Sequence, residues 1–352
     1  MQQQRRKLMM GLGLGLMSRR PLAAPQSRPL LRVLAWPGYA EPEVIKSFEQ
    51  SSGASVELTL IDSDLDLWQK MNAKQGANFD VFAVNTAELQ RYIGQGLVAP
   101  IERALIPNLA LQLPRFRQAA AIPGLNAGQD VLGVPFAFAE MGLIYDRRQL
   151  QKAPDSIAAL WDPGLSRRVV AYNGGTHNFS LAAQSLNLPV PFRLSDKDWA
   201  PAVDRLIALR RNAAGFYTQP EESVALFKSR QAALMFANFG RQQLLLLKAA
   251  GVDAAYVIPK EGALAWLDCW VISLAAQQNS PLAHAWINHL LGESASQLLS
   301  SRQGLGNTTQ ETPDYPAGDK LIWLQTVENE ARRNHLWHRI LSGDRAAKVL
   351  AP

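Results

Sequence analysis

The alternation of strand-like and helix-like segments near the start of the chain limits its fold more than any other feature. Apolar runs suited to strands are each followed by a segment of helical periodicity. The order is 30–36, 42–53, 55–61, 64–73, 79–84 and 86–96, and Thr86 is expected to cap the last helix. Strands that are joined by helices pair in parallel. The sequence therefore predicts an α/β protein with mainly parallel sheets covered by helices.

A second region of the same kind follows a less regular stretch rich in proline, glutamine and alanine, residues 100–130. The chain enters this region through the apolar run 131–146. Strands are expected at 167–171, 232–237, 254–259 and 266–274, helices at 179–186, 196–212, 220–230 and 240–251, and a helical tail from 280 onward. The simplest assembly is two α/β units with a cleft between them.

Residues 1–27 have the features of an export signal and leader. A basic start precedes the short apolar run 8–17, and Ala23 and Ala24 are small residues that suit cleavage. The pair Arg5 and Arg6 and the glycine-diluted apolar run favour the twin-arginine route. We therefore expect a periplasmic protein.

The basic charge of the chain belongs mainly to this leader. The sequence has 36 Lys and Arg against 30 Asp and Glu, a formal net charge of +6. Five of the basic residues precede the expected cleavage site, so 31 would remain against 30 acidic residues. This balance does not indicate a nucleic-acid partner.

Motifs typical of enzymes and cofactor sites are absent from the sequence. It has no Gly-x-Ser-x-Gly, no Walker loop, no His-Glu-x-x-His and no Cys-x-x-Cys. The five histidines are scattered, and Cys269 is the only cysteine, so neither a disulfide nor a zinc site is expected. We predict a protein that is not an enzyme and that holds no metal or cofactor.

Aromatic and acidic residues stand where two of the predicted strands begin or end. Trp36 and Tyr39 follow the first strand, and Trp266 and Asp268 alternate along a later one, so both point to one face. A carboxylate beside indole rings suits capture of a cation. The alternative is that both tryptophans belong to the core and that Asp268 pairs locally.

The segment YNGGTHN, residues 172–178, lies between a predicted strand and a predicted helix. Backbone N–H groups and the helix dipole make such a junction a natural anion cradle. The alternative is a simple turn, in which the glycines only allow unusual backbone angles.

Six segments, in order, resemble the periplasmic spermidine/putrescine-binding proteins of ABC importers. They are 33–56, 79–101, 132–150, 156–170, 233–240 and 258–273. The resemblance implies a two-lobed periplasmic-binding-protein fold of type II, with a mainly parallel sheet flanked by helices in each lobe and the ligand in the cleft. Lobe 1 would comprise 28–138 and 268–315, and lobe 2 would comprise 139–267 and 316–352. It also implies a monomer that works with an ABC permease in the inner membrane.

The resemblance also implies ligand-binding residues. Two aromatic residues match the family's first-lobe wall, a Trp-x-Asp pair matches its amine anchor, and three small polar residues fall at its polar contacts. These are, respectively, Trp36 and Tyr39; Trp266 and Asp268; and Asn85, Thr218 and Asn238.

Several positions depart from the family pattern. Ala237, Ala87 and Leu305 stand where the family has aromatic residues. Gly174 and His177 stand where the family has an acidic pair, and Glu140 is a candidate to restore one charge.

Three hypotheses follow for the function. The first is binding of a linear polyamine for import, although an ammonium group that is desolvated without a partner costs several kcal/mol. The second is binding of a zwitterionic amine, with its anionic group held by Thr176, His177 and the backbone of the turn. His177 would then make affinity depend on pH near neutrality. The third is a ligand sensor for a membrane receptor, or an exported enzyme.

Overall fold

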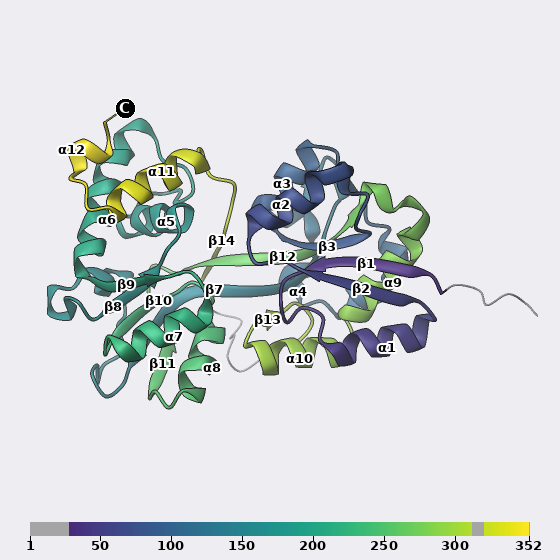
Figure 1. The fold of residues 1–352 in the computed structure, drawn as a ribbon, viewed down its shortest axis with the longest axis horizontal. Coiled ribbons are helices and arrows are strands. Elements are labelled where there is room, and N and C mark those ends of the chain that lie inside the picture. The colour runs from purple at the N-terminus through teal and green to yellow at the C-terminus, as the bar shows by residue number, and fades with distance from the viewer. Residues whose placement is uncertain (1–27, 312–319, 352) are drawn as a thin grey trace, which may run out of the picture.

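The structure, a computed structural model, describes residues 28–311 and 320–351 and consists of two α/β lobes side by side (Figure 1). The predicted leader, residues 1–27, lies outside the described residues. Within those residues no helix is long and apolar enough to cross a bilayer.

Lobe 1 contains the predicted alternation of strands and helices. Its elements are β1(Leu30–Ala35), α1(Pro42–Ser52), β2(Ser55–Leu60), α2(Asp64–Asn72), β3(Val81–Asn85) and α3(Thr86–Gly94). The strands pair in parallel in the order β2-β1-β3, as predicted. The expected cap of α3 was wrong by one residue, because Asn85 accepts the hydrogen bond from the Glu88 amide and Thr86 is already helical.

Lobe 2 is built on a second parallel set of strands. Its elements are β8(Val169–Tyr172), α5(Gly175–Ser185), α6(Trp199–Asn212), β9(Ala213–Tyr217), α7(Pro220–Ser229), β10(Leu234–Ala237), α8(Arg241–Ala249) and β11(Ala254–Val257). β10, β8 and β9 lie side by side in parallel. The sequence pattern did not predict β9, which is short and contains Gly215.

Two long strands join the lobes. β7(Val134–Asp146) carries the chain into lobe 2, and β12(Ala263–Ser273) carries it back. The two strands pair antiparallel with each other, from Leu264 opposite Met141 to Trp270 opposite Val134. β12 is also antiparallel to β3, and β7 is antiparallel to β10 and β11. Each lobe thus has a parallel set of strands bordered by antiparallel strands of the junction.

The remaining elements cover the sheets or close the junction. They are β4(Val98–Ala99), α4(Pro114–Arg117), β5(Asn126–Ala127), β6(Asp130–Val131), α9(Ser280–Leu290), α10(Glu293–Gln303), β13(Gly306–Asn307), β14(Leu321–Trp323), α11(Glu330–Leu341) and α12(Ala346–Val349). The tail is therefore not purely helical, because β14 pairs in parallel with the start of β12. α11 then packs on α5 and α6 of lobe 2.

Each lobe has its own buried core. Trp270, Trp286 and Phe48 pack in lobe 1, whereas Phe179, Trp199 and Trp337 pack in lobe 2. Cys269 is buried in lobe 1, as expected from its apolar surroundings. Two separate cores allow each lobe to act as a unit around the shared strands.

Candidate functional site

The ends of the parallel strands of the two lobes meet at the junction. β1 and β3 end in lobe 1 where β8 and β10 end in lobe 2, and the helices that follow begin there. The lobes touch at this place, because the Thr326 hydroxyl donates to the Ala87 carbonyl at 3.0 Å. The junction side of open α/β sheets is where ligands bind. We call the side chains gathered here the interlobe site.

The turn after β1 brings Tyr39 to the site. Gly38 has a φ of 84°, a conformation that residues with a Cβ rarely adopt, and a Cβ there would also contact the Gln303 side chain. The turn rests on Gln303, whose Nε2 donates to Glu41 Oε1 at 2.9 Å.

Asp268 is the centre of the site in lobe 1. Its side chain is buried, and the Tyr39 hydroxyl donates to Asp268 Oδ2 at 2.6 Å. The pairing of β12 with β7 shifts register between Asp268 and Cys269, a bulge of the kind that re-aims side chains. Burial raises the pKa of Asp268 to about 7. No basic side chain pairs with Asp268 in the part of the chain that the structure describes.

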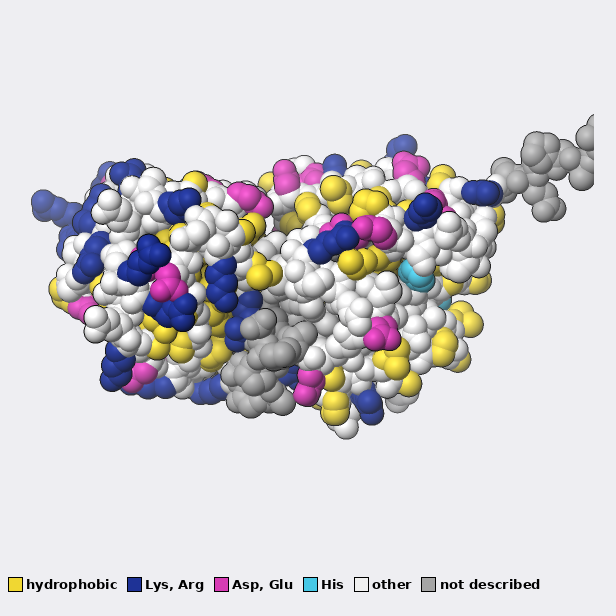
Figure 2. Space-filling view, turned by 90° about the horizontal axis from the view of Figure 1, so that it is seen from below, with side chains coloured by type: hydrophobic (Ala, Val, Ile, Leu, Met, Phe, Trp, Pro, Cys, Tyr) yellow, Lys and Arg dark blue, Asp and Glu magenta, His cyan; other side chains and the backbone are white. Residues whose placement is uncertain are grey.

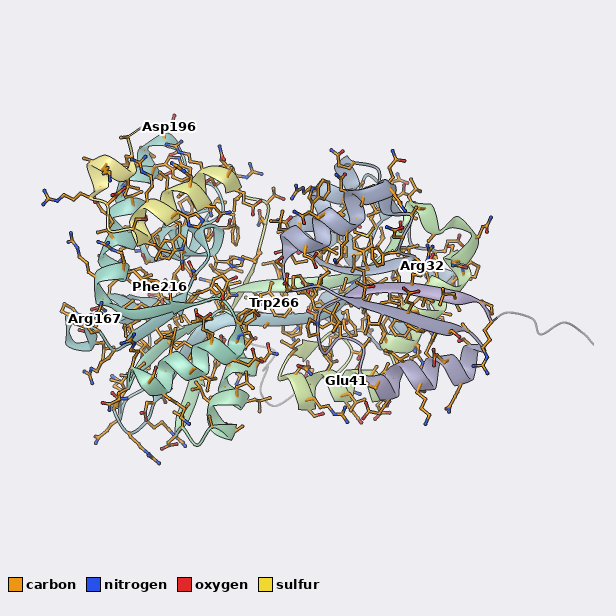
Figure 3. All side chains as sticks on the ribbon, in the orientation of Figure 1. Arg32, Glu41, Arg167, Asp196, Phe216 and Trp266 are labelled. Carbon is orange, nitrogen blue, oxygen red and sulfur yellow. The ribbon has the colours of Figure 1, made fainter. Side chains whose placement is uncertain are left out.

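The two predicted tryptophans lie half-buried at the junction, where Figure 3 labels Trp266. Trp266 packs against the cores of both lobes, and its Nε1 donates to the Asn238 carbonyl of lobe 2 at 3.2 Å. Nε1 of Trp36 is buried and has no acceptor among the described residues. Both rings contribute to the cores, yet each keeps an exposed part.

Three carboxylates that sequence reasoning missed face this site. Asp64 and Glu88 belong to α2 and α3 of lobe 1, and Glu330 begins α11 of lobe 2. Asn85 links the first two, because its Nδ2 donates to Asp64 Oδ1 at 3.2 Å while its Oδ1 caps α3. The sequence does contain a signal for Asp64, because this residue begins a helix just beyond the end of a strand, where open α/β sheets bind ligands.

The charges of these carboxylates act on one another across the junction. Burial and then the charges of Asp268 and Glu330 raise the pKa of Asp64 to about 7. Burial and then the charges of Asp64 and Glu330 raise the pKa of Glu88 to about 7, with Arg91 only partly offsetting this. The Asp64 side chain keeps part of its surface accessible to solvent, so a ligand at the junction could reach it. The interlobe site is therefore strongly acidic.

In lobe 2 the YNGGTHN segment gives a strand end and the first turn of α5. Its glycines permit close packing rather than unusual angles, since Gly174 has a φ of −150°. A Cβ on Gly175 would lie 2.6 Å from Oδ1 of Asn334 in α11. The α5 turn is held by the fully buried Arg333, which donates to the Thr176 carbonyl at 3.0 Å and pairs with Glu328 at 2.8 Å.

His177 does not behave as the sequence suggested. Burial, and secondarily the charge of Arg333, lower its pKa to about 4, so it is neutral near pH 7. Its ring lies beside Tyr172, with 5.5 Å between centroids. This lowered pKa opposes the pH dependence through His177 near neutrality that the sequence suggested. Thr176 Oγ1 is buried and has no partner within the described ranges.

The other predicted polar residues differ in how they are placed. Asn238 is buried beside Trp266, and its Oδ1 has no partner among the residues described. Thr218 is exposed, and its hydroxyl donates to Glu222 at 2.8 Å, so it is occupied locally. Glu140 is buried and pairs with Arg241 at 3.2 Å, so its charge is already compensated.

Comparison with known proteins identifies the family. The family model of bacterial extracellular solute-binding proteins matches residues 43–323. The chain belongs to this family. A related solute-binding protein, the putrescine-binding periplasmic protein PotF of Escherichia coli, is 23% identical over 92% of this chain and 93% of its own.

Two further relatives support the resemblance that the motifs indicated. The putrescine/agmatine-binding protein of Pseudomonas aeruginosa is 24% identical over 85% of this chain and 80% of its own. The solved structure of the lipoprotein Tp0655 (TpPotD) of Treponema pallidum has a TM-score of 0.75 and 18% identity, covering 89% of this chain and 99% of that one. The predicted resemblance and the two-lobed fold are thus confirmed.

A surface cavity on this solute-binding protein lies away from the interlobe site. It has a volume of about 530 Å³ and lies between α1 and α9 on lobe 1. Its lining includes Phe48, Asn108 and His289 and none of the residues of the interlobe site. We place the candidate site at the junction because Asp268, a buried carboxylate without a basic partner among the described residues, lies there.

Proposed function

We propose that this chain is the substrate-binding component of an ABC importer and captures a small amine of the polyamine class at the interlobe site. One observation carries the proposal: Asp268 is a buried carboxylate that Tyr39 hydrogen-bonds and no basic residue of the described chain neutralises. A buried charge without a partner is costly, and a ligand ammonium would supply the partner. The exposed parts of Trp36 and Trp266 add cation–π attraction and cover methylene groups.

The acidic side chains around Asp268 favour a ligand with more than one positive charge. Asp64 and Glu88 face the site from lobe 1, and Glu330 faces it from lobe 2. These carboxylates replace, at other positions, the acidic pair missing at Gly174 and His177. A cation between the lobes would relieve their mutual repulsion and would favour closure.

A zwitterionic ligand is the second candidate. The first turn of α5 and the unpartnered Thr176 hydroxyl favour it, because both suit an anionic group. Two features oppose it: His177 is neutral, and Arg333 is already paired with Glu328. We therefore place this candidate second. Nothing in the geometry favours a sensor or an exported enzyme over these two.

We further propose that the protein acts in the periplasm with an ABC permease of the inner membrane. The relatives are named as periplasmic binding proteins, and the leader has the features of an export signal. The twin-arginine route, the monomeric state and the exact lobe boundaries remain predictions from the sequence.

Thermal-shift screening with putrescine, spermidine, γ-aminobutyrate and an aminoalkylphosphonate would test the ligand class. A specific ligand at a hundred times its dissociation constant adds about 2.7 kcal/mol of stability. The proposal predicts a shift with putrescine or spermidine. A shift with γ-aminobutyrate or the phosphonate alone would favour the second candidate, and turnover of any amine would indicate an enzyme.

A further inference from the structure

The strand order of lobe 2 gathers arginine-rich connections at one end of the molecule. β8, β9 and β10 are parallel to one another, and β7 is antiparallel to β10. The first residues of β8, β9 and β10 therefore lie at the same edge as the last residues of β7. These connections carry arginines, which we name together the arginine cap: Arg147, Arg148, Arg167, Arg168, Arg210, Arg211 and Arg230.

Hydrogen bonds between the connections establish that the cap is one contiguous surface. The Arg167 amide donates to the Asn212 carbonyl at 2.7 Å, and the Arg168 carbonyl accepts from the Ala233 amide at 2.8 Å. Gln149 Nε2 donates to the Ala232 carbonyl at 2.9 Å. Figure 3 places Arg167 at the end of lobe 2 remote from lobe 1, whereas Trp266 lies at the junction. The cap is therefore at the opposite end of β8 from the interlobe site.

Most of the charge of the cap is uncompensated. Arg147 pairs with Asp253. The other nearby carboxylates, Asp146 and Asp162, accept hydrogen bonds from amides of their own turns. Exposed arginines without an ion pair in the described ranges remain, namely Arg148, Arg167, Arg211 and Arg230. Figure 2 shows Lys and Arg side chains concentrated on the half of the surface that lobe 2 forms.

The cap offers charge but almost no apolar surface. The large hydrophobic side chains exposed in the described residues lie elsewhere: Leu30, Leu60, Leu65, Leu105, Leu111, Val190, Leu245 and Leu274. A protein interface normally has an apolar or aromatic centre, and single-stranded nucleic acid needs aromatic rings for stacking. Trp161, which lies six residues before Arg167 in the chain, is covered by Arg205 at 4.0 Å. Dispersed exposed arginines instead suit a diffuse array of negative charges, as on an anionic lipid surface.

We propose that the arginine cap holds the protein on an anionic phospholipid surface by electrostatic attraction. Contact through the cap would turn the far end of lobe 2 toward the membrane and leave the interlobe site open to solvent. Confinement to the membrane surface would raise the concentration of the protein near any membrane partner. This inference does not depend on the ligand of the interlobe site.

Sedimentation with vesicles tests the proposal on the chain from residue 28 onward, because the basic and apolar residues of the expected leader would themselves bind anionic vesicles. The vesicles contain 30% phosphatidylglycerol in phosphatidylcholine, or phosphatidylcholine alone, at low and high salt. The cap variant is Arg148→Gln with Arg211→Gln and Arg230→Gln. The control is Lys46→Gln with Arg193→Gln and Lys197→Gln, exposed residues away from the cap, so net charge falls equally.

The expected result is that the cap variant loses about tenfold or more of its partitioning onto anionic vesicles at low salt. The control should keep most of it, and high salt should abolish the difference. Circular dichroism melts that match across the three proteins exclude unfolding as the cause. Equal losses in both variants, no loss in the cap variant, or equal binding to neutral vesicles would overturn the proposal. The proposal would also be overturned if the cap bound an oligonucleotide more tightly than it binds the anionic vesicles.

Discussion

At the scale of single residues, a buried carboxylate decides the chemistry of the site. Asp268 accepts a hydrogen bond from Tyr39 at 2.6 Å and is only 5% exposed, so its surroundings exclude water without neutralising its charge. Its raised pKa reflects this lack of a partner, since burial is its largest cause. A buried carboxylate without a partner destabilises the empty protein, and this is why we propose Asp268 as the anchor for a cation.

Replacing Asp268 with Asn tests that dual role. The substitution keeps an acceptor for the Tyr39 hydroxyl but removes the charge, so putrescine affinity should fall by about 100-fold, as for other buried charge pairs. The ligand-free variant should be at least as stable as the parent at pH 8. Calorimetric titration and chemical denaturation measure the two effects. If the variant binds putrescine as tightly as the parent protein, Asp268 is not the anchor.

The pH dependence of binding should follow the carboxylates rather than His177. The pKa values of Asp268, Asp64 and Glu88 are raised to about 7, so their contribution to stability, present at low pH, is lost as pH rises through about 7. A bound dication favours their charged forms, so putrescine affinity should rise from pH 5.5 to pH 8. We expect an increase of about tenfold or more.

The matching control is His177→Gln. Because the pKa of His177 is lowered to about 4, this variant should have the same profile of affinity between pH 5.5 and pH 8. A flat profile in the parent protein would refute the role of the carboxylates. A profile that disappears in the His177 variant would restore the interpretation made from the sequence.

At the scale of elements, the contact of α5 with α11 fixes the lobe 2 side of the site. Gly175 lets the backbone of α11 approach the first turn of α5, and Arg333 ties Thr176 and Ser180 to that helix. The glycines of the YNGGTHN segment are thus explained by packing. An anion cradle is not needed to account for them.

Gly175→Ala should therefore destabilise the protein by about 1–3 kcal/mol, because the new methyl group would overlap with Asn334. Gly94→Ala is the matched control, since a Cβ at that helical position meets nothing within 4 Å. It should leave stability unchanged or raise it by about 0.5–1 kcal/mol. Urea denaturation compares the two, and equal stabilities would contradict the packing explanation.

Gln303 connects the ligand-side turn to both lobes and should influence affinity. It supports Gly38, donates to Glu41 at 2.9 Å, and accepts from Gln242 of lobe 2 at 3.5 Å. Gln303→Ala should weaken putrescine binding by about fivefold, since one hydrogen bond contributes about 1 kcal/mol. Gln297→Ala, on the same helix and with a side chain that hydrogen-bonds only to Glu293 in the described structure, should have no effect. If both variants bind equally well, Gln303 has no positioning role.

At the scale of the whole molecule, local patterns predicted most elements but not the partners of the site. The alternation in residues 30–96 and the Trp266–Asp268 pair are local signals, so they were readable from the sequence. Glu330 is brought opposite Asp64 only because β14 returns the chain to lobe 2, which no local pattern encodes. The pKa of His177 was not predictable for the same reason, since the charge of Arg333 in α11 contributes to lowering it.

The arrangement of the two lobes supports our proposal that a dication binds between them. Carboxylates from both lobes meet at the junction, and the lobes have separate cores joined by β7 and β12. Repulsion between these carboxylates therefore opposes closure of the empty protein. A ligand with two positive charges would neutralise that repulsion. A ligand with one positive and one negative charge would not.

Calorimetric titration of the purified protein at pH 8 with putrescine and, separately, with γ-aminobutyrate tests this claim most directly. The two ligands have similar length and differ in the charge at one end. We expect saturable binding of putrescine at least about tenfold tighter than that of γ-aminobutyrate. Tighter binding of γ-aminobutyrate, or no binding of putrescine, would contradict it.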